Sequence, residues 1–137
     1  MLSFRPRMPL LVLVLAFSAG CNSGPRASVE GKVSYDGETV DKGRIAFIPV
    51  EEDAGTLRAT GPIHDGRYHL DNQGGPTPGK YRVEIHWRKK TGKKVPGEGG
   101  QPRDEAVPGI PAKYNTESKL IVDVRPGRNT FDFALEK

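Results

Sequence analysis

The stretch Tyr81-Arg82-Val83-Glu84-Ile85-His86-Trp87 alternates between apolar and polar residues without a break. Successive side chains of a β-strand point to opposite faces, so this pattern places the apolar residues on one face and the polar residues on the other. One face can then be buried while the other meets water. The stretch therefore predicts a half-buried strand over 80–87, with Ile85 and Trp87 among its core residues.

The same alternation recurs on both sides of this stretch, for example at Leu120, Val122 and Val124. Seven short strands are predicted, at 29–35, 43–48, 58–63, 67–71, 80–87, 119–124 and 130–135. No segment has the sustained apolar stripe of an amphipathic helix. The number and spacing of the strands are typical of two packed sheets, so the expected fold class is all-β, a single seven-stranded Greek-key-type β-sandwich over 28–137.

Asp-Gly pairs occur twice between predicted strands, at Asp36-Gly37 and Asp65-Gly66. Glycine adopts positive φ at little cost, which tight hairpin turns require. Both pairs are therefore interpreted as turns, and Asp65 beside His64 as part of a hairpin rather than as a catalytic acid–base pair.

Several short motifs follow one another in a fixed order. They are Val29-Glu30-Gly31-Lys32-Val33, Tyr35-Asp36-Gly37, Gly43-Arg44-Ile45-Ala46-Phe47, Asp65-Gly66-Arg67-Tyr68-His69-Leu70 and Pro78-Gly79-Lys80-Tyr81-Arg82-Val83. In this order they resemble the carboxypeptidase regulatory-like domains, which are transthyretin-like β-sandwiches. The later Ile110-Pro111-Ala112-Lys113-Tyr114-Asn115 and Pro126-Gly127-Arg128-Asn129 are similar to small lipoproteins of planctomycete genomes. The resemblance covers nearly all of 28–137 and implies an accessory or binding module without carboxypeptidase activity.

The segment 88–118 differs from the predicted strands, because it is rich in Gly and Pro and shows no alternation. Loops longer than about 12–15 residues in compact domains tend to be functional or disordered. The segment is therefore predicted to be a long loop. Residues 88–111 are expected to be mobile, dispensable for folding and the site of the recognition surface, whereas Ile110, Pro111 and Tyr114 are expected to pack back onto the edge of the sandwich.

The N-terminal residues have the three parts of an export signal. Arg5 and Arg7 precede an apolar run over 10–17, which is too short to span a bilayer. The run ends at Ser18-Ala19-Gly20-Cys21, which resembles the lipobox of bacterial lipoproteins. We therefore expect residues 1–20 to be a lipoprotein signal peptide that is cleaved between Gly20 and Cys21. Cys21 is then expected to carry a lipid anchor, and residues 21–27 to form a tether. Asn22 after the cysteine favours the outer membrane over the inner one.

The charge balance points away from nucleic acid. Removal of 1–20 takes Arg5 and Arg7 and leaves 19 basic and 17 acidic residues. So small a positive excess is not typical of nucleic-acid-binding domains, and exposed aromatic residues are not interleaved with the charges.

A basic cluster follows Trp87 and consists of Arg88, Lys89, Lys90, Lys93 and Lys94. One interpretation is a loop kept soluble by its charge. The other is a contact with an anionic partner, either lipid headgroups or an acidic polymer of the envelope.

No catalytic, metal or cofactor site is expected. His69 and His86 occupy outward positions of strands taken to be neighbours, and His64 lies at a turn, but their spacing matches no zinc motif. No Gly-x-Ser-x-Gly motif is present, and the single cysteine is assigned to the lipid.

Two functions remain open at this point. The first is a lipid-anchored, noncatalytic module of the cell envelope for adhesion, assembly or binding of an envelope protein or polysaccharide. The second is a carbohydrate- or other ligand-binding module that uses the 88–118 loop around Trp87 and Tyr114. The exposure of Trp87 distinguishes them, because a platform for sugar rings requires an exposed indole.

Overall fold

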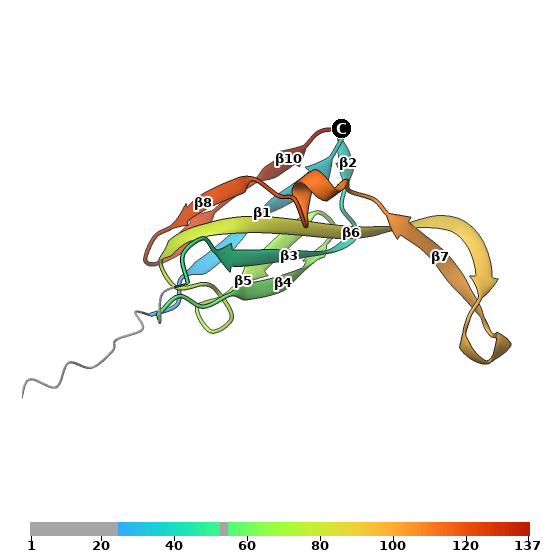
Figure 1. The fold of residues 1–137 in the computed structure, drawn as a ribbon, viewed down its shortest axis with the longest axis horizontal. Helices are drawn as coiled ribbons and strands as arrows, with labels where there is room; N and C mark the ends of the chain where they lie inside the picture. Colours follow the sequence, from blue (N-terminus) through green and yellow to red (C-terminus); the bar gives the residue numbers. More distant parts are fainter. Residues whose placement is uncertain (1–24, 53–54) are drawn as a thin grey trace, which may run out of the picture.

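The computed structural model describes residues 25–52 and 55–137. The predicted signal peptide, Gly20 and Cys21 lie outside these residues. The elements along the described chain are β1 (Ser28–Tyr35), β2 (Glu38–Thr39), β3 (Lys42–Pro49), β4 (Ala59–His64), β5 (Arg67–Leu70), β6 (Gly79–Pro96), the 3-10 turn η1 (Glu98–Gly100), β7 (Pro102–Pro108), the 3-10 turn η2 (Ala112–Tyr114), β8 (Leu120–Val124), β9 (Arg128–Thr130) and β10 (Phe133–Leu135). Figure 1 shows this all-β architecture.

The strands form one curled sheet in the order β10-β1-β5-β4-β3-β6-β7. β2 and β9 also pair with β1, and β8 also pairs with β6. All pairs are antiparallel except those of β1 with β9 and with β10. β8 and β9 follow each other in the chain but pair with β6 and β1, so the sheet folds over and its two parts enclose one core. The all-β sandwich expected from the sequence is confirmed.

The register of β6 agrees with the alternation in the sequence. Tyr81, Val83 and Ile85 are fully buried, and Trp87 is 5% exposed. Ile85 faces Ile45 across the β3–β6 ladder, and the ring of Phe47 meets Tyr81 edge-on at a centroid distance of 6.5 Å. The apolar face of β6 is thus the centre of the core.

The strand count differs from the expected seven because short strands were not distinguished in the sequence and because β7 lies in a segment that was predicted to be a loop. The predicted strand over 130–135 is two strands, β9 and β10, which pair with different parts of β1. β2 is an additional two-residue strand beside the Asp36-Gly37 turn. Asp36, Gly37, Asp65 and Gly66 all have positive φ, so both Asp-Gly turns are confirmed.

The prediction of a long loop over 88–118 is wrong for most of its length. β6 continues to Pro96, and β7 returns beside it with pairs from Arg88↔Pro108 to Pro96↔Pro102. We call this hairpin, residues 88–108, the arm. None of its residues is buried, so no apolar alternation marked its strands; backbone pairing between two polar segments forms them instead.

Residues 109–118 return from the arm to the body. Ile110 is 3% exposed and belongs to the core, and Tyr114 packs against the core from its edge. The hydroxyl of Ser118 donates a hydrogen bond to the carbonyl of Val83. This part of the predicted loop is therefore fixed to β6, as expected for Ile110 and Tyr114.

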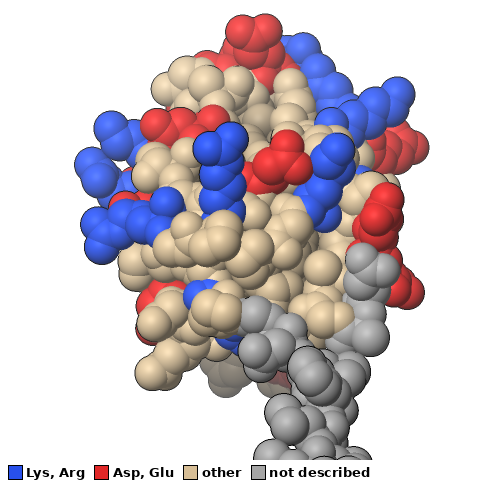
Figure 2. Space-filling model, turned by 90° about the vertical axis from the view of Figure 1, so that its left-hand side faces the viewer, with Lys and Arg blue, Asp and Glu red and all other residues tan. Residues whose placement is uncertain are grey.

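The arm and the start of β1 lie at opposite ends of the body (Figure 1). The backbone N–H of Ala27 donates to the carbonyl of Pro76 and that of Ser28 to the carbonyl of Gly127, which places the first described residues beside those turns. We call this the tether end. Figure 2 shows its surface, where basic and acidic side chains are interspersed around uncharged residues.

Candidate functional site

A groove of about 720 Å³ lies where the arm joins the body. Its walls come from β3, from β6 and from residues 108–116, and we call it the base groove. Lys42, Arg44 and Arg88 contribute cationic side chains to it, and Trp87 and Ile110 contribute apolar surface. The pairing of β3 with β6 brings these residues together, with Gly43 opposite Trp87 and Arg44 opposite His86.

Trp87 is held in one position at the groove. Its Nε1–H donates a hydrogen bond of 2.7 Å to Oδ1 of Asp41. Gly109 packs on the indole so closely that an added Cβ would lie 2.7 Å from Cε3. Because only 5% of Trp87 is exposed, it contributes little surface to the groove and is not an exposed platform for sugar rings. Its position in the core is the one expected from the sequence.

The carboxylate of Asp41 is stabilised in its charged form. The hydrogen bond from Trp87 is the main cause of its lowered pKa, and the backbone N–H of Lys42 adds to the effect. Asp41 therefore stays ionised beside the groove and has its Oδ1 occupied by the two donors.

The five basic residues predicted as a cluster are spread along the arm. Arg88 donates to the carbonyl of Ala106 at 2.7 Å, and Lys89 lies 2.5 Å from a carboxylate oxygen of Glu38. The Nζ of Lys89 is also 5.4 Å from the ring centroid of Trp87.

Lys90 and Lys94 share one acidic partner, Asp104 of β7. Hydrogen bonds from these two lysines lower the pKa of Asp104 to about 2, and the hydrogen bond from Lys90 has the larger effect. Lys93 makes no side-chain ion pair within residues 25–52 and 55–137. Three of the five basic residues, Lys89, Lys90 and Lys94, therefore have acidic partners. This pairing reduces the net positive charge along the arm.

The histidines lie apart from one another. His69 is on β5 and His86 on β6, and β4 and β3 separate these strands, so the expectation that they are neighbours is wrong. Each contacts a glutamate: Glu30 at 3.2 Å for His69 and Glu84 at 3.3 Å for His86. Within the described part of the chain, no group of three or more His, Cys, Asp or Glu residues could hold a metal ion.

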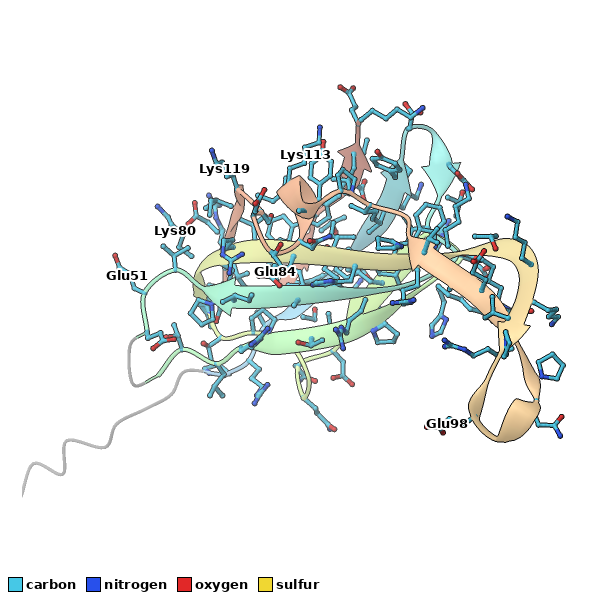
Figure 3. All side chains as sticks on the ribbon, turned by 45° about the vertical axis from the view of Figure 1, so that its right-hand side comes forward. Glu51, Lys80, Glu84, Glu98, Lys113 and Lys119 are labelled. Carbon is cyan, nitrogen blue, oxygen red and sulfur yellow. The ribbon has the colours of Figure 1, made fainter. Side chains whose placement is uncertain are left out.

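Glu84 lies on the outer face of β6, as the alternation predicts, and is labelled in Figure 3. Its carboxylate accepts from Arg82 Nη1 at 2.7 Å and lies 3.3 Å from His86 Nε2. Partial burial alone would raise its pKa, but the hydrogen bonds of His86 and Arg82 outweigh burial and lower the pKa. Glu84 is therefore an anchored carboxylate rather than a free one.

The sequence did not single out Lys42, Arg44 or Asp41. The sequence pattern around them is weak, since they are polar residues at the start of an ordinary strand. They are also far from Trp87 in the chain; Asp41, for example, precedes it by 46 residues. Only the pairing of β3 with β6 makes them neighbours of the residues that the sequence did mark.

Comparisons with known proteins give remote likenesses. No family model and no curated protein matches the chain. Among solved structures, it is similar to a proposed carbohydrate-binding protein of Pseudomonas aeruginosa, at 11% identity and a TM-score of 0.46, over 87% of this chain and 93% of that one. It is also similar to a 9R-lipoxygenase of Cyanothece, at 12% identity and a TM-score of 0.37, over 82% of this chain but 16% of that one.

Likenesses this remote assign neither a family nor a function to the chain. The resemblance to carboxypeptidase regulatory-like domains stays a prediction. Within residues 25–52 and 55–137, no helix has the length and apolar character needed to cross a bilayer.

Proposed function

We propose that this protein is a lipid-anchored, noncatalytic module of the cell envelope that binds a partner with the end of the body that carries the arm. The observation that carries the proposal is the opposite placement of the arm and the tether end (Figure 1). A body held by one end leaves its other end accessible to a macromolecule.

The anchor rests on the sequence over 10–21, which combines a short apolar run with small residues before Cys21. Each buried CH₂ of an acyl chain contributes about 0.8 kcal/mol, so several chains on Cys21 hold a protein stably on a membrane. Asn22 supports the outer membrane as the proposed location.

The partner follows from the reach of the tether. Residues 21–27 span at most about 25 Å when fully extended, so the tether end of the body stays close to the anchoring membrane. The arm lies at the end of the body farthest from this attachment point (Figure 1). This favours an envelope protein or polysaccharide as the partner over the headgroups of the same membrane.

The module is proposed as noncatalytic because the residues that could react have other roles. The lone cysteine, Cys21, is assigned to the lipid. Asp65, beside His64, has φ 47° in a tight turn whose geometry already accounts for the Asp-Gly pair.

The anchor is tested by mass and by labelled-palmitate incorporation. The native protein should begin at a lipid-modified Cys21, and Cys21→Ser should lose the label. An unlipidated native protein with another N-terminus would contradict the anchor.

The binding surface is tested by photo-crosslinking in intact cells. A photoreactive phenylalanine analogue replaces Lys93 or Gln101 on the arm, and Asn72 or Arg125 at the tether end as matched exposed controls. Discrete crosslinked products are expected from the arm positions alone. Products from the tether end alone, or from neither end, would contradict the proposal.

A further inference from the structure

We infer that the outer face of the sheet binds a linear polyanion, a chain of successive carboxylates or phosphates, on a row of basic side chains that crosses β1, β5, β4 and β3. The inference deepens the proposed function, since it rests on the arm end as the recognition surface and names the chemistry of the partner. The register of the four strands, the missing acidic partners of the row and the carboxylates on its two sides support it.

Strand register builds the row. Lys32 of β1 faces Arg67 of β5, and Arg67 faces His64 of β4. His64 in turn faces Lys42 of β3. We call these four exposed residues the basic row. Residues that face each other across a ladder share one side of the sheet, and neighbouring strands lie about 4.8 Å apart, so the row is about 14 Å long.

The basic row joins two hollows of the surface. Lys42 lines the base groove together with Arg88, the first residue of the arm. Lys32, His64 and Arg67 line a second hollow of about 630 Å³ on the same side of the sheet. The row thus begins beside the arm and belongs to the end of the body that carries it.

The side chains of the row have no acidic partner of their own. Within residues 25–52 and 55–137, none of the four side chains forms a hydrogen bond or an ion pair. Asp132, which lines the second hollow, accepts the backbone N–H of Lys32 instead. Elsewhere on the outer face, Arg82 is paired with Glu84. The charges of the row are therefore available for an anion from outside the chain.

The row is unfavourable for the fold by itself. Like charges that face each other across a ladder destabilise a sheet, and Lys32 faces Arg67 directly. His64 adds to the repulsion between Arg67 and Lys42 whenever it is protonated. Such a conflict between local charge and fold is expected at functional sites. A polyanion on the row would remove the repulsion.

The carboxylates around the row favour a chain over a flat surface. They lie on both sides of it, with Asp41 and Asp65 in the turns beyond the row and Glu30 and Glu84 on the strands before it. An anionic membrane would cover both sides and meet these carboxylates, whereas a single chain that follows the row avoids them. Because the row is about 14 Å long, a compact anion contacts only part of it.

The outer face offers charge but no stacking surface to such a chain. The aromatic residues of the sheet strands point to the other face: Phe47, Tyr68, Tyr81 and Trp87 are buried, and Tyr35 packs against the core. Neither sugar rings nor nucleobases therefore find an aromatic side chain beside the row. The row selects a chain by its successive charges and not by its backbone, so an acidic peptide and a polyphosphate should bind alike.

The test uses isothermal titration calorimetry on residues 21–137 with Cys21→Ser. One probe is an oligo-L-glutamate of about twelve residues, which extends beyond the row, and the other is a linear polyphosphate of equal charge. Both are expected to bind with salt-sensitive Kd values within about fivefold of each other. Free glutamate and inorganic phosphate, at equal charge concentration, should bind at least about tenfold more weakly because they make one contact at a time.

The variant Lys32→Gln/Arg67→Gln/Lys42→Gln is expected to raise the Kd for both chains at least about tenfold, because three charge-assisted contacts are lost. Its unfolding temperature should stay equal or rise, since the repulsion across the β1–β5 ladder is removed. A lower unfolding temperature would show that the row supports the fold, and would contradict the inference.

The matched control is Lys80→Gln/Lys119→Gln/Arg125→Gln, which removes the same charge from exposed positions. Figure 3 shows Lys80 and Lys119 far from the arm. The control should change the Kd less than about twofold, since screened distant charges act weakly. Vesicles of phosphatidylcholine and phosphatidylglycerol test a membrane surface, and no binding that depends on the row is expected.

The inference is overturned if neither chain binds, if only one of the two backbones binds, if the compact anions bind as tightly as the chains, or if both triple variants weaken binding equally. Binding of the anionic vesicles that is lost in the row variant would assign the row to a membrane and overturn it as well. None of these results alters the crosslinks expected from Lys93 and Gln101. A failure of the row is thus distinguished from a failure of the arm end as the binding surface.

Discussion

The indole Nε1 of Trp87 donates a 2.7 Å hydrogen bond to the carboxylate of Asp41, 46 residues earlier in the chain. This contact joins the end of the buried part of β6 to the residue that precedes β3. It holds the only tryptophan at the border between the core, the base groove and the arm.

Replacing Asp41 with Ala is expected to destabilise the domain by about 1 kcal/mol, because Trp87 loses a charged acceptor that solvent partly screens. Asp41→Asn should cost less, since its amide oxygen still accepts. Denaturant unfolding followed by Trp87 fluorescence measures both variants. Equal stability of Asp41→Ala and the unchanged protein would mean that water replaces the carboxylate fully.

Ile85→Ala is expected to cost about 2–5 kcal/mol of unfolding free energy, because the side chain is fully buried and its loss leaves a cavity. The control on the same strand is the exposed Lys80→Ala, expected to cost less than about 0.5 kcal/mol. Urea unfolding measures both. Similar costs at the two positions would contradict the register of β6.

Glu84→Gln is expected to reduce the loss of stability on acidification. The hydrogen bonds of His86 and Arg82 lower the pKa of Glu84 despite its burial, so the folded pKa lies below the ordinary 4.5. Ionised Glu84 thus contributes stability above that pH, and the contribution disappears as the pH falls through the folded pKa. Unfolding midpoints from neutral pH to pH about 3 measure the effect. Parallel pH profiles for the two proteins would contradict it.

Replacing residues 90–106 with Asn-Gly is expected to change the unfolding free energy by less than about 0.5 kcal/mol, because no residue of the arm is buried. Lys89 and Val107 face each other across the β6–β7 ladder, so a two-residue turn can join them. Gly109 and Ile110 are kept because they pack on the body. A large loss of stability would show that the arm supports the fold.

The strands with one buried face could be predicted from residue order. Tyr81, Val83 and Ile85 alternate with charged residues, and the burial of alternate side chains imposes that pattern on any half-buried strand. The Asp36-Gly37 and Asp65-Gly66 turns were predictable as well, since positive φ restricts the residues that such turns accept.

The arm could not be predicted in this way. Its strands bury neither face, so their sequence shows no alternation of apolar and polar residues. The pairs of Lys90 and Lys94 with Asp104 exist only once the hairpin has formed. The Gly and Pro residues that suggested a loop are tolerated because the arm is exposed. The prediction of a loop was wrong because a strand that buries neither face needs no apolar alternation.

Local order in the chain was enough for the all-β class, the core face of β6 and the two Asp-Gly turns, because periodicity and turn geometry act over a few residues. The base groove depended on contacts distant in the chain. Lys42 and Arg44 become neighbours of Trp87 and His86 only when β3 pairs with β6 in one register. Backbone hydrogen bonds alone would allow other registers, and burial of Ile45 and Ile85 on the same face selects this one.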